Sequence, residues 1–209
     1  SRLVLSRDRL GIKPLYYTLD AGGLRLASEV KVLTGSGSNI TPASIAAYLQ
    51  WGACPEDLLL YPAINVVPAG HAMIIRAGEE PEIWRYWPAR KKFESASTAA
   101  PQRVRSLLEA AVEEHLLSDV PVASFLSGGI DSSIVTALAA QRLGRKLQTF
   151  TVGFDLAEYD ESAIALEVAQ HFGTTHQRLQ LTEDEVIDSV TAAVGHLDLP
   201  SVDAINTYI

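Results

Sequence analysis

The sequence has a single cysteine, Cys54, among its 209 residues. One cysteine cannot form an intramolecular disulfide, so a disulfide-stabilised scaffold is excluded and a reducing compartment is favoured. No apolar run approaches the ~20 residues that a membrane-spanning helix needs. Basic residues are few as well, because 17 Lys and Arg stand against 25 Asp and Glu and leave a net charge of −8. We therefore predict a cytoplasmic protein with no nucleic-acid or membrane partner.

The chain also lacks an initial Met, and it ends at Tyr208-Ile209 directly after a turn-like stretch. We interpret both ends as positions inside folded structure. The sequence is accordingly predicted to be a fragment of a protein more than twice as long.

A change in composition divides what is present into two parts. Residues 88–100 are rich in Ala, Ser, Thr, Lys and Arg and show no apolar period, which is typical of a linker. We predict a first domain over residues 1–90, a linker over 91–100 and a second domain over 101–209.

Short strands separated by Gly and Pro turns are predicted in the first domain. Strands are expected at 2–7, at the end of 8–17, at 24–28, at the end of 66–75 and at 83–87. A short helix is expected at 28–33. Thr41 and Pro42 occupy the N-cap and first position of a longer helix that ends at Gly52. Arg7, Asp8 and Arg9 are predicted to form a turn held by ion pairs.

Strands and helices alternate in the second domain. A helix from Pro101 carries one apolar face, and the apolar run 120–126 predicts a buried strand covered on both faces. Another strand is expected at 147–154 and a third over TTHQRLQL, with helices after each strand. Thr182 and Glu185 form a capping box for the last helix. This order predicts a parallel sheet with right-handed crossovers.

The segment 127–133, SGGIDSS, joins the strand 120–126 to a helix. Free backbone N–H groups at a helix N-terminus favour a phosphate through hydrogen bonds and the helix dipole. Gly128 and Gly129 allow the backbone to approach a ligand and to adopt positive φ, and Asp131 can hold a Mg²⁺ that bridges phosphate oxygens. The segment is neither GxxxxGK[ST] nor GxGxxG. For S-G-G alone, an ordinary strand-to-helix turn is an equal interpretation.

These residues resemble a known family. SGGIDSS resembles the pyrophosphate loop of the ATP pyrophosphatases, and SDVPVASFLSGGIDSSIVTALAA resembles the synthetase domain of glutamine-hydrolysing asparagine synthetases, which usually have Gly at the position of Ala123. RDRLGIKPLYY and LASEVKVL resemble the later half of their glutaminase domain. The resemblance implies an α/β, parallel-sheet ATP-pyrophosphatase (HUP-like) domain preceded by part of an antiparallel αββα glutaminase domain.

The resemblance also implies a reaction, in which ATP and Mg²⁺ convert the side chain of aspartate to β-aspartyl-AMP with release of pyrophosphate. Ammonia from glutamine then displaces AMP. The matching ATP and pyrophosphate-binding residues are Leu126, Ser127, Gly128, Gly129, Asp131, Ser132, Ser133 and Val152. Asp131 would hold the Mg²⁺, and Leu126 and Val152 would meet the adenine through their backbones. A homodimer of the full-length protein is compatible with this family.

No catalytic residue is expected in this chain. The glutaminase of the family uses a cysteine at the mature N-terminus whose α-amine is the base, whereas Cys54 is internal and is interpreted as an ordinary thiol. His71 has no partner at metal-site spacing and is interpreted as a turn-edge residue. The acids of Asp160-Glu161-Ser162, which resembles the D-E-S segment of the family, are interpreted first as a helix N-terminus. Residues 198–208 resemble the D-x-P-S-x-D-G-x-N-T-Y segment, with Ala204 in place of Gly.

Two other interpretations stay open at this point. A related adenylating enzyme could act on another carboxylate, as in beta-lactam or peptide cyclisation. A tRNA-thiolating enzyme belongs to the same group of relatives, but it would need a basic surface and catalytic cysteines, and both are absent from this sequence. The chain could also be an inactive nucleotide-binding remnant or an interaction module.

Overall fold

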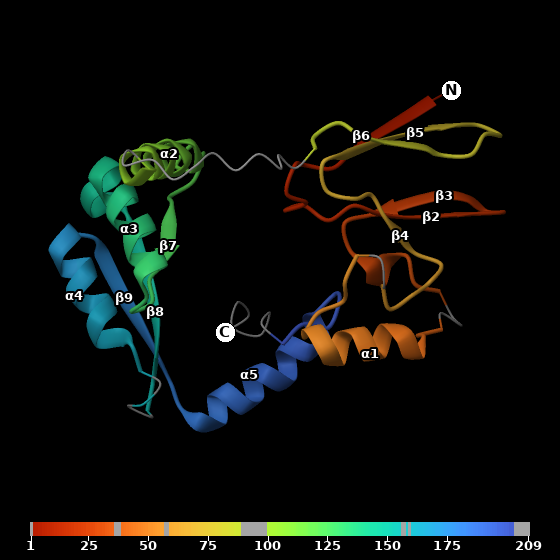
Figure 1. Cartoon of the computed structure of the whole chain (residues 1–209). Coiled ribbons are helices and arrows are strands. Elements are labelled where there is room, and N and C mark those ends of the chain that lie inside the picture. The colour runs from red at the N-terminus through yellow and green to blue at the C-terminus, as the bar shows by residue number, and fades with distance from the viewer. Residues whose placement is uncertain are drawn as a thin grey trace. The chain divides into compact units, whose positions relative to one another are not determined.

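The computed structural model describes residues 2–35, 39–56, 59–88, 100–155, 158 and 160–202. Its contacts group into two compact units (Figure 1). The first unit contains Ser1–Lys92 together with Val190–Tyr208, and the second contains Phe93–Ser189 with Ile209. The predicted linker 91–100 lies outside the described residues except for Ala100, so the domain boundaries stay a prediction.

The first unit holds two antiparallel three-stranded sheets. One sheet has the order β1 (Arg2–Ser6), β5 (His71–Arg76), β6 (Glu82–Arg85), and the other has the order β3 (Gly23–Ala27), β2 (Tyr16–Asp20), β4 (Asn65–Val66). The register of the first pair places Leu5 opposite Met73. Each strand predicted in this part of the sequence is present, although β2 continues to Asp20 beyond the predicted range and β4 was not predicted.

Two adjacent tyrosines of β2 show how these layers pack. Successive side chains of a strand point to opposite faces, so Tyr16 and Tyr17 enter different cores. Tyr17 packs with Leu5 and Met73, which belong to the other sheet, so the two sheets lie face to face. Tyr16 packs on the opposite side in a cluster that contains Val30 of the short helix η1 (Val30–Val32).

A longer helix, α1 (Pro42–Trp51), also belongs to this unit. As predicted, the Thr41 hydroxyl accepts from the Ser44 N–H at 3.1 Å, Pro42 opens the helix, and Gly52 ends it at φ +70°. The Ser44 hydroxyl donates to the Leu59 carbonyl at 2.8 Å. The described residues thus show two β layers and helices; the complete αββα arrangement stays a prediction.

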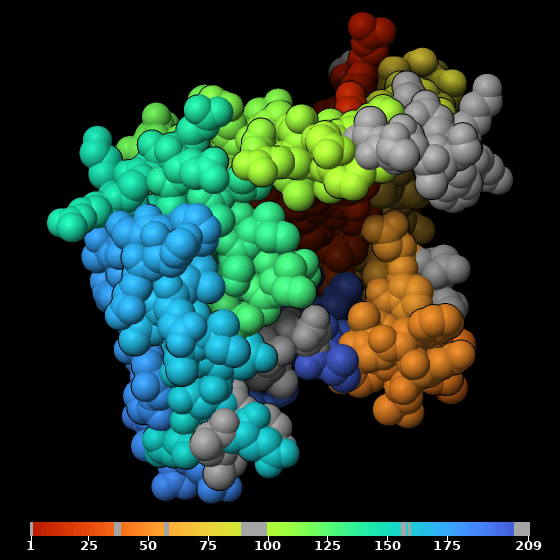
Figure 2. All heavy atoms as spheres, turned by 60° about the vertical axis from the view of Figure 1, so that its left-hand side comes forward, coloured from red at the N-terminus to blue at the C-terminus, as the bar shows by residue number. Residues whose placement is uncertain are grey.

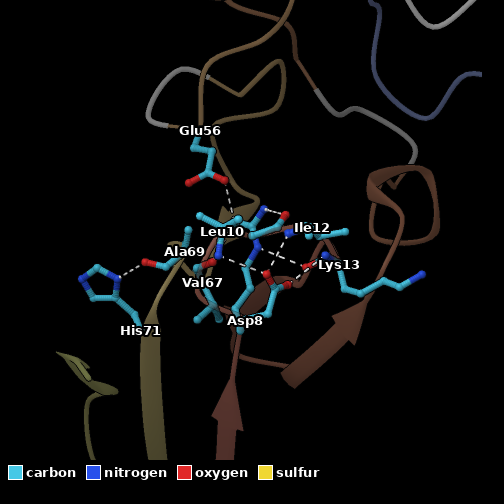
Figure 3. A network of polar contacts seen from close by, with 10 residues as sticks. Asp8, Leu10, Ile12, Lys13, Glu56, Val67, Ala69 and His71 are labelled. Atoms are coloured by element: carbon cyan, nitrogen blue, oxygen red, sulfur yellow. Dashed lines mark hydrogen bonds and ion pairs between the residues drawn. The ribbon is translucent and has the colours of Figure 1, made fainter. Parts of the chain in front are cut away.

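The turn after β1 is held by hydrogen bonds between side chains and backbone groups, so the prediction that ion pairs hold it is wrong (Figure 3). The carboxylate of Asp8 accepts from the N–H groups of Leu10, Ile12 and Lys13 at 3.1, 3.0 and 2.9 Å. Turn N–H groups need acceptors, and a short Asp side chain supplies them locally. The buried guanidinium of Arg7, 7% exposed, donates to the Gly11 and Lys13 carbonyls of the same turn at 2.8 and 3.1 Å and pairs with Glu56 at 2.6 Å.

The second unit holds a parallel sheet with the order β7 (Ala123–Phe125), β8 (Gln148–Phe154), β9 (Thr175–Leu181). Its helices are α2 (Ala100–His115), α3 (Ile130–Leu143), the short η2 (Gly144–Lys146) and α4 (Ser162–Phe172), and α5 (Glu183–His196) runs from this unit into the first. The predicted strand–helix alternation and parallel pairing are confirmed. So is the capping box, because the Glu185 carboxylate accepts from the Thr182 N–H at 2.8 Å and the Thr182 hydroxyl accepts from the Glu185 N–H at 3.3 Å.

Only one face of this sheet is covered within the described residues. Ser124 of β7 contacts Thr136 of α3 at 3.1 Å, and Leu126 packs against Ala165 of α4. Both helices therefore lie on the same side of the sheet (Figure 1). On the other face Phe125 is 77% exposed. The prediction of a strand covered on both faces is wrong for β7, because the described helices supply cover for one face alone.

The apolar face of α2 is covered in part. Val112 and Leu116 pack against Ala139 and Ala140 of α3. The remaining apolar residues include Leu107, which is 62% exposed, and α2 lies at the surface in Figure 2. Among the described residues, no helix combines the length and the apolar character needed to cross a membrane.

Candidate functional site

The candidate site begins directly after β7, at Leu126. Its N–H donates to the Phe150 carbonyl of β8 at 2.8 Å, and its carbonyl accepts from the Thr151 hydroxyl. Its side chain is 1% exposed and packs against Ala165 of α4. Leu126 is therefore a fixed anchor for the loop, and its contact with a ligand stays a prediction.

The predicted serines link the loop to the first turn of α3. The hydroxyls of Ser127 and Ser132 lie 2.9 Å apart, and the Ser132 hydroxyl accepts from the Ser127 N–H at 3.2 Å. The Ser133 hydroxyl donates to the Gly129 carbonyl at 2.7 Å. These contacts give the serines a scaffolding role that the sequence interpretation, which assigned them to ATP and pyrophosphate binding, did not include.

The two glycines allow neighbouring groups to lie close to the backbone, and their own backbone angles are ordinary. Neither Gly128 nor Gly129 has a positive φ, and Gly129 is the N-cap of α3 at φ −77°. The expectation of positive φ is therefore wrong. A Cβ on Gly128 would lie 2.9 Å from the Cβ of Glu161, so a side chain cannot fit there without displacing the start of α4.

The first turn of α3 presents donors that no described residue uses. Helix geometry leaves the first N–H groups of a helix without an intrahelical acceptor. The N–H groups of Ser127 and Gly129 donate to the hydroxyls of Ser132 and Ser127. The N–H groups of Ile130, Asp131 and Ser132 have no acceptor among the described residues. Because the positive end of the helix dipole coincides with these donors, the turn is suited to bind an anion.

Asp131 places a carboxylate in the same turn, and its side chain is exposed. The described residues contain no group of three or more His, Cys, Asp or Glu that could hold a metal ion. Magnesium commonly binds to one or two carboxylates together with phosphate oxygens and water. An exposed carboxylate of this kind fits a Mg²⁺ held together with phosphate oxygens, and the role of Asp131 as its ligand stays a prediction.

Glu161 contacts this loop, whereas the sequence interpretation assigned it first to a helix N-terminus. Its Oε2 accepts from the Gly128 N–H at 3.1 Å. The neighbouring Asp160 performs the capping role: its Oδ1 accepts from the Ser162 N–H at 3.0 Å, and Arg178 contacts its Oδ2 at 2.9 Å. Hydrogen bonds from Ser162, followed by the charge of Arg178, hold the pKa of Asp160 below its ordinary value. The sequence signal that could have identified Glu161 is the pair of acids at the start of the helix that follows β8, the strand beside β7.

Val152 lies in β8, next to the residues that follow β7, and it pairs with Leu179 of β9. It is half-buried, and it sits two residues beyond Phe150, whose carbonyl accepts from Leu126. The structure thus brings Val152 and Leu126 to the same edge of one sheet. Their contact with adenine stays a prediction.

The remaining candidate residues belong to the first unit, whereas the loop belongs to the second. Burial raises the pKa of the Cys54 thiol, which disfavours the thiolate that a nucleophile requires. His71 donates from Nδ1 to the Ala69 carbonyl at 2.8 Å, at the edge of a turn (Figure 3). Asp198 accepts from the N–H groups of Val30 and Lys31, and the rest of its predicted segment, from Asp203 onward, lies outside the described residues.

Two known protein families match two consecutive segments of the chain. Residues 1–87 match a glutamine amidotransferase domain, and residues 103–209 match the family described as asparagine synthase. The second match covers more than half of the chain.

Individual relatives agree with these matches. Asparagine synthetase [glutamine-hydrolyzing] 1 of Bacillus subtilis (strain 168) is 32% identical over 201 residues, which are 95% of this chain and 32% of that protein. Asparagine synthetase [glutamine-hydrolyzing] 3 of the same organism is 28% identical over 219 residues, covering 96% and 36%. Amidase chyE of Penicillium rubens (strain ATCC 28089 / DSM 1075 / NRRL 1951 / Wisconsin 54-1255) is 34% identical over 223 residues, covering 96% and 33%.

The chain therefore spans about a third of the length of the curated relatives that it matches. Among solved structures, an NH3-dependent NAD synthetase from Campylobacter jejuni subsp. jejuni NCTC 11168 overlaps with 51% of this chain and 45% of its own. The TM-score is 0.37 and the identity 16%, a likeness too partial to support an argument.

Proposed function

This chain belongs to the glutamine-hydrolysing asparagine synthetase family, and we propose that its loop 127–133 binds the polyphosphate of ATP. The observation that carries the proposal is the first turn of α3, where the N–H groups of Ile130, Asp131 and Ser132 have no acceptor among the described residues. Phosphate groups are among the anions that helix N-termini after a glycine-containing loop commonly bind.

The reaction follows from the family and is proposed for the whole protein. ATP adenylates the side chain of aspartate to give β-aspartyl-AMP and pyrophosphate, and ammonia released from glutamine displaces AMP to form the amide. Pairing of two copies also stays a proposal for the whole protein. The described residues of this chain contribute the loop and no group suited to glutamine hydrolysis, so the chain by itself is expected to be inactive.

The loop residues have a defined task in this scheme. Negative charge accumulates on the departing pyrophosphate, and the backbone N–H groups of the first turn are positioned to receive it without rearrangement. The contacts among Ser127, Ser132, Ser133 and Gly129 hold those donors in place. Magnesium, when bound, would neutralise phosphate charge, and Asp131 is the side chain that would hold it.

Amidase chyE supports a second candidate, a related enzyme that forms or acts on an amide with a different carboxylate substrate. The loop would perform the same task in both, because it contacts phosphate and not the carboxylate. Pyrophosphate release measured with aspartate and with a panel of other carboxylates separates the two candidates.

Mg·ATP binding by the natural protein that contains this chain tests the proposal. Calorimetry should show that Asp131→Ala weakens binding about tenfold, the loss expected for one charged contact. Gly129→Val should weaken it more, because a Cβ there would lie 3.2 Å from the Ser127 hydroxyl and would fill the approach to the donors.

The matched control is Asp119→Ala, which removes one exposed carboxylate before β7. Its binding of Mg·ATP should equal that of the unmodified protein. If Asp131→Ala and Gly129→Val both leave binding unchanged, the loop is not a phosphate site.

A further inference from the structure

The loop that we propose for polyphosphate already contacts an anionic group of the chain itself. Oε2 of Glu161 accepts from the Gly128 N–H at 3.1 Å. The contact joins residues separated by 33 positions, so it depends on the packing of the α4 N-terminus against the loop. A phosphate oxygen requires the same kind of donor.

The carboxylate of Glu161 is not needed by its own helix. Glu161 is the N-cap of α4 by position, but its side chain makes no capping hydrogen bond. Asp160 accepts from the Ser162 N–H instead, and the Glu161 carbonyl accepts from the Ala165 N–H at 3.2 Å. The backbone of Glu161 is thus fixed while its exposed side chain can rotate away without disturbing α4.

Charges near the loop make such a rotation favourable when a polyphosphate arrives. The first turn of α3 and the start of α4 carry three carboxylates, those of Asp131, Asp160 and Glu161. Within the described part of the chain, Arg178 is the cation paired with this group, through Asp160. No ion pair among the described residues neutralises Glu161, so its carboxylate and a phosphate would repel each other across the Gly128 N–H.

We propose that Glu161 is a built-in competitor for the phosphate loop. Its carboxylate holds the Gly128 N–H until a polyphosphate displaces it, which lowers the affinity of the loop for anions and keeps its shape close to the bound form. This inference rests on the proposed function, because it assumes that loop 127–133 is where polyphosphate binds.

The test compares Glu161→Gln and Glu161→Ala with the unmodified natural protein. Glu161→Gln keeps the size of the side chain and an acceptor oxygen but removes the charge, and Glu161→Ala removes the contact. Glu167→Gln is the matched control, because it removes an equal charge from an exposed position of the same helix. The probes are metal-free pyrophosphate and Mg·ATP, each titrated by calorimetry.

We expect Glu161→Gln to bind metal-free pyrophosphate about threefold to fivefold more tightly, the size of an exposed charged contact, and Glu167→Gln to bind it unchanged. The gain should shrink when salt is raised from about 0.05 M to about 0.5 M, because exposed charges are screened. Without ligand, Glu161→Ala should also speed hydrogen exchange of the peptide that contains Gly128.

The remaining outcomes contradict the inference in distinguishable ways. If the unmodified protein binds both probes and the Glu161 variants bind them equally or more weakly, Glu161 is a neutral neighbour or a metal ligand and the inference is wrong, while the phosphate loop stands. If neither the unmodified protein nor either Glu161 variant binds pyrophosphate or Mg·ATP, both the inference and the proposed function fail.

Discussion

At the scale of the residue, the ionised form of Asp8 is the one that the folded chain uses. Its carboxylate accepts from three backbone N–H groups, and the hydrogen bonds from Lys13 and Ile12 hold its pKa below the ordinary value of 3.8. A carboxyl whose pKa is lowered by folding stabilises the folded state above its ordinary pKa. That stabilisation is lost as pH falls through the lowered pKa.

We therefore predict that Asp8→Asn lowers the urea midpoint of the first unit at pH 6 and lowers it less at pH 3. Tryptophan fluorescence reports this unit, because Trp51, Trp84 and Trp87 all belong to it. Asp119→Asn is the control and should change neither midpoint. A loss of equal size at both pH values would show that the charge of Asp8 is not what holds the turn.

Cys54 gives a second prediction at this scale. Burial raises the pKa of its thiol above the ordinary value of 9.0, and the thiolate is the reactive form. Iodoacetamide should label Cys54 more slowly than a free cysteine peptide at pH 7.5, followed by mass spectrometry. Labelling faster than the peptide, or ammonia release from glutamine that Cys54→Ser abolishes, would contradict the interpretation of an ordinary thiol.

At the scale of the element, the segment after α5 is held by contacts within the first unit. The Asp198 carboxylate accepts from the Val30 N–H at 2.7 Å and from the Lys31 N–H at 2.9 Å, the first turn of η1. The Val202 N–H donates to the Gly52 carbonyl at 2.9 Å. Residues matched to the asparagine synthase family therefore cap a helix of the glutamine amidotransferase part.

This contact predicts the effect of Asp198→Asn. The amide retains one acceptor oxygen where the carboxylate has two, so the local stability of η1 should fall by about 1 kcal/mol. Hydrogen exchange of the peptide that contains Val30 and Lys31 should become faster by about fivefold. Asp188→Asn, at an exposed position of α5, is the control and should leave this peptide unchanged. Unchanged exchange in Asp198→Asn would remove the capping role.

At the scale of the whole molecule, apolar side chains of the second unit remain exposed on the open face of its sheet and near α2. Phe125 is 77% exposed on the open face of the sheet, and Leu107 and Leu117 are 62% and 91% exposed near α2. Large exposed apolar side chains that gather into patches mark surfaces for contact with other polypeptide in soluble proteins. These surfaces are suited to contact with further polypeptide.

The 209 residues expressed alone should therefore bind a hydrophobic dye strongly and give weak near-UV dichroism. Phe125→Ser combined with Leu107→Gln should lower dye fluorescence, because both side chains are exposed, while replacement of the exposed Thr191 by Ser should not. A monomer that melts cooperatively and binds no dye would contradict this prediction.

The sequence by itself determined the local elements and the position of the candidate site. Apolar periodicity, Thr41 with Pro42, and Thr182 with Glu185 specify where strands and helices begin, because caps and face patterns act over a few residues. SGGIDSS specified the strand-to-helix junction for the same reason. The order of elements then required a parallel sheet.

Tertiary structure decided what these elements contact. Glu161 reaches Gly128 across 33 positions and Asp198 reaches Val30 across 168, and no local pattern encodes such pairs. Packing also decided that one face of β7 is open and that Arg7 is buried beside Glu56. Position 128 requires glycine because Glu161 lies so close to it, and not because its φ is positive. Periodicity specifies which side chains share a face, whereas burial depends on what the rest of the fold places against it.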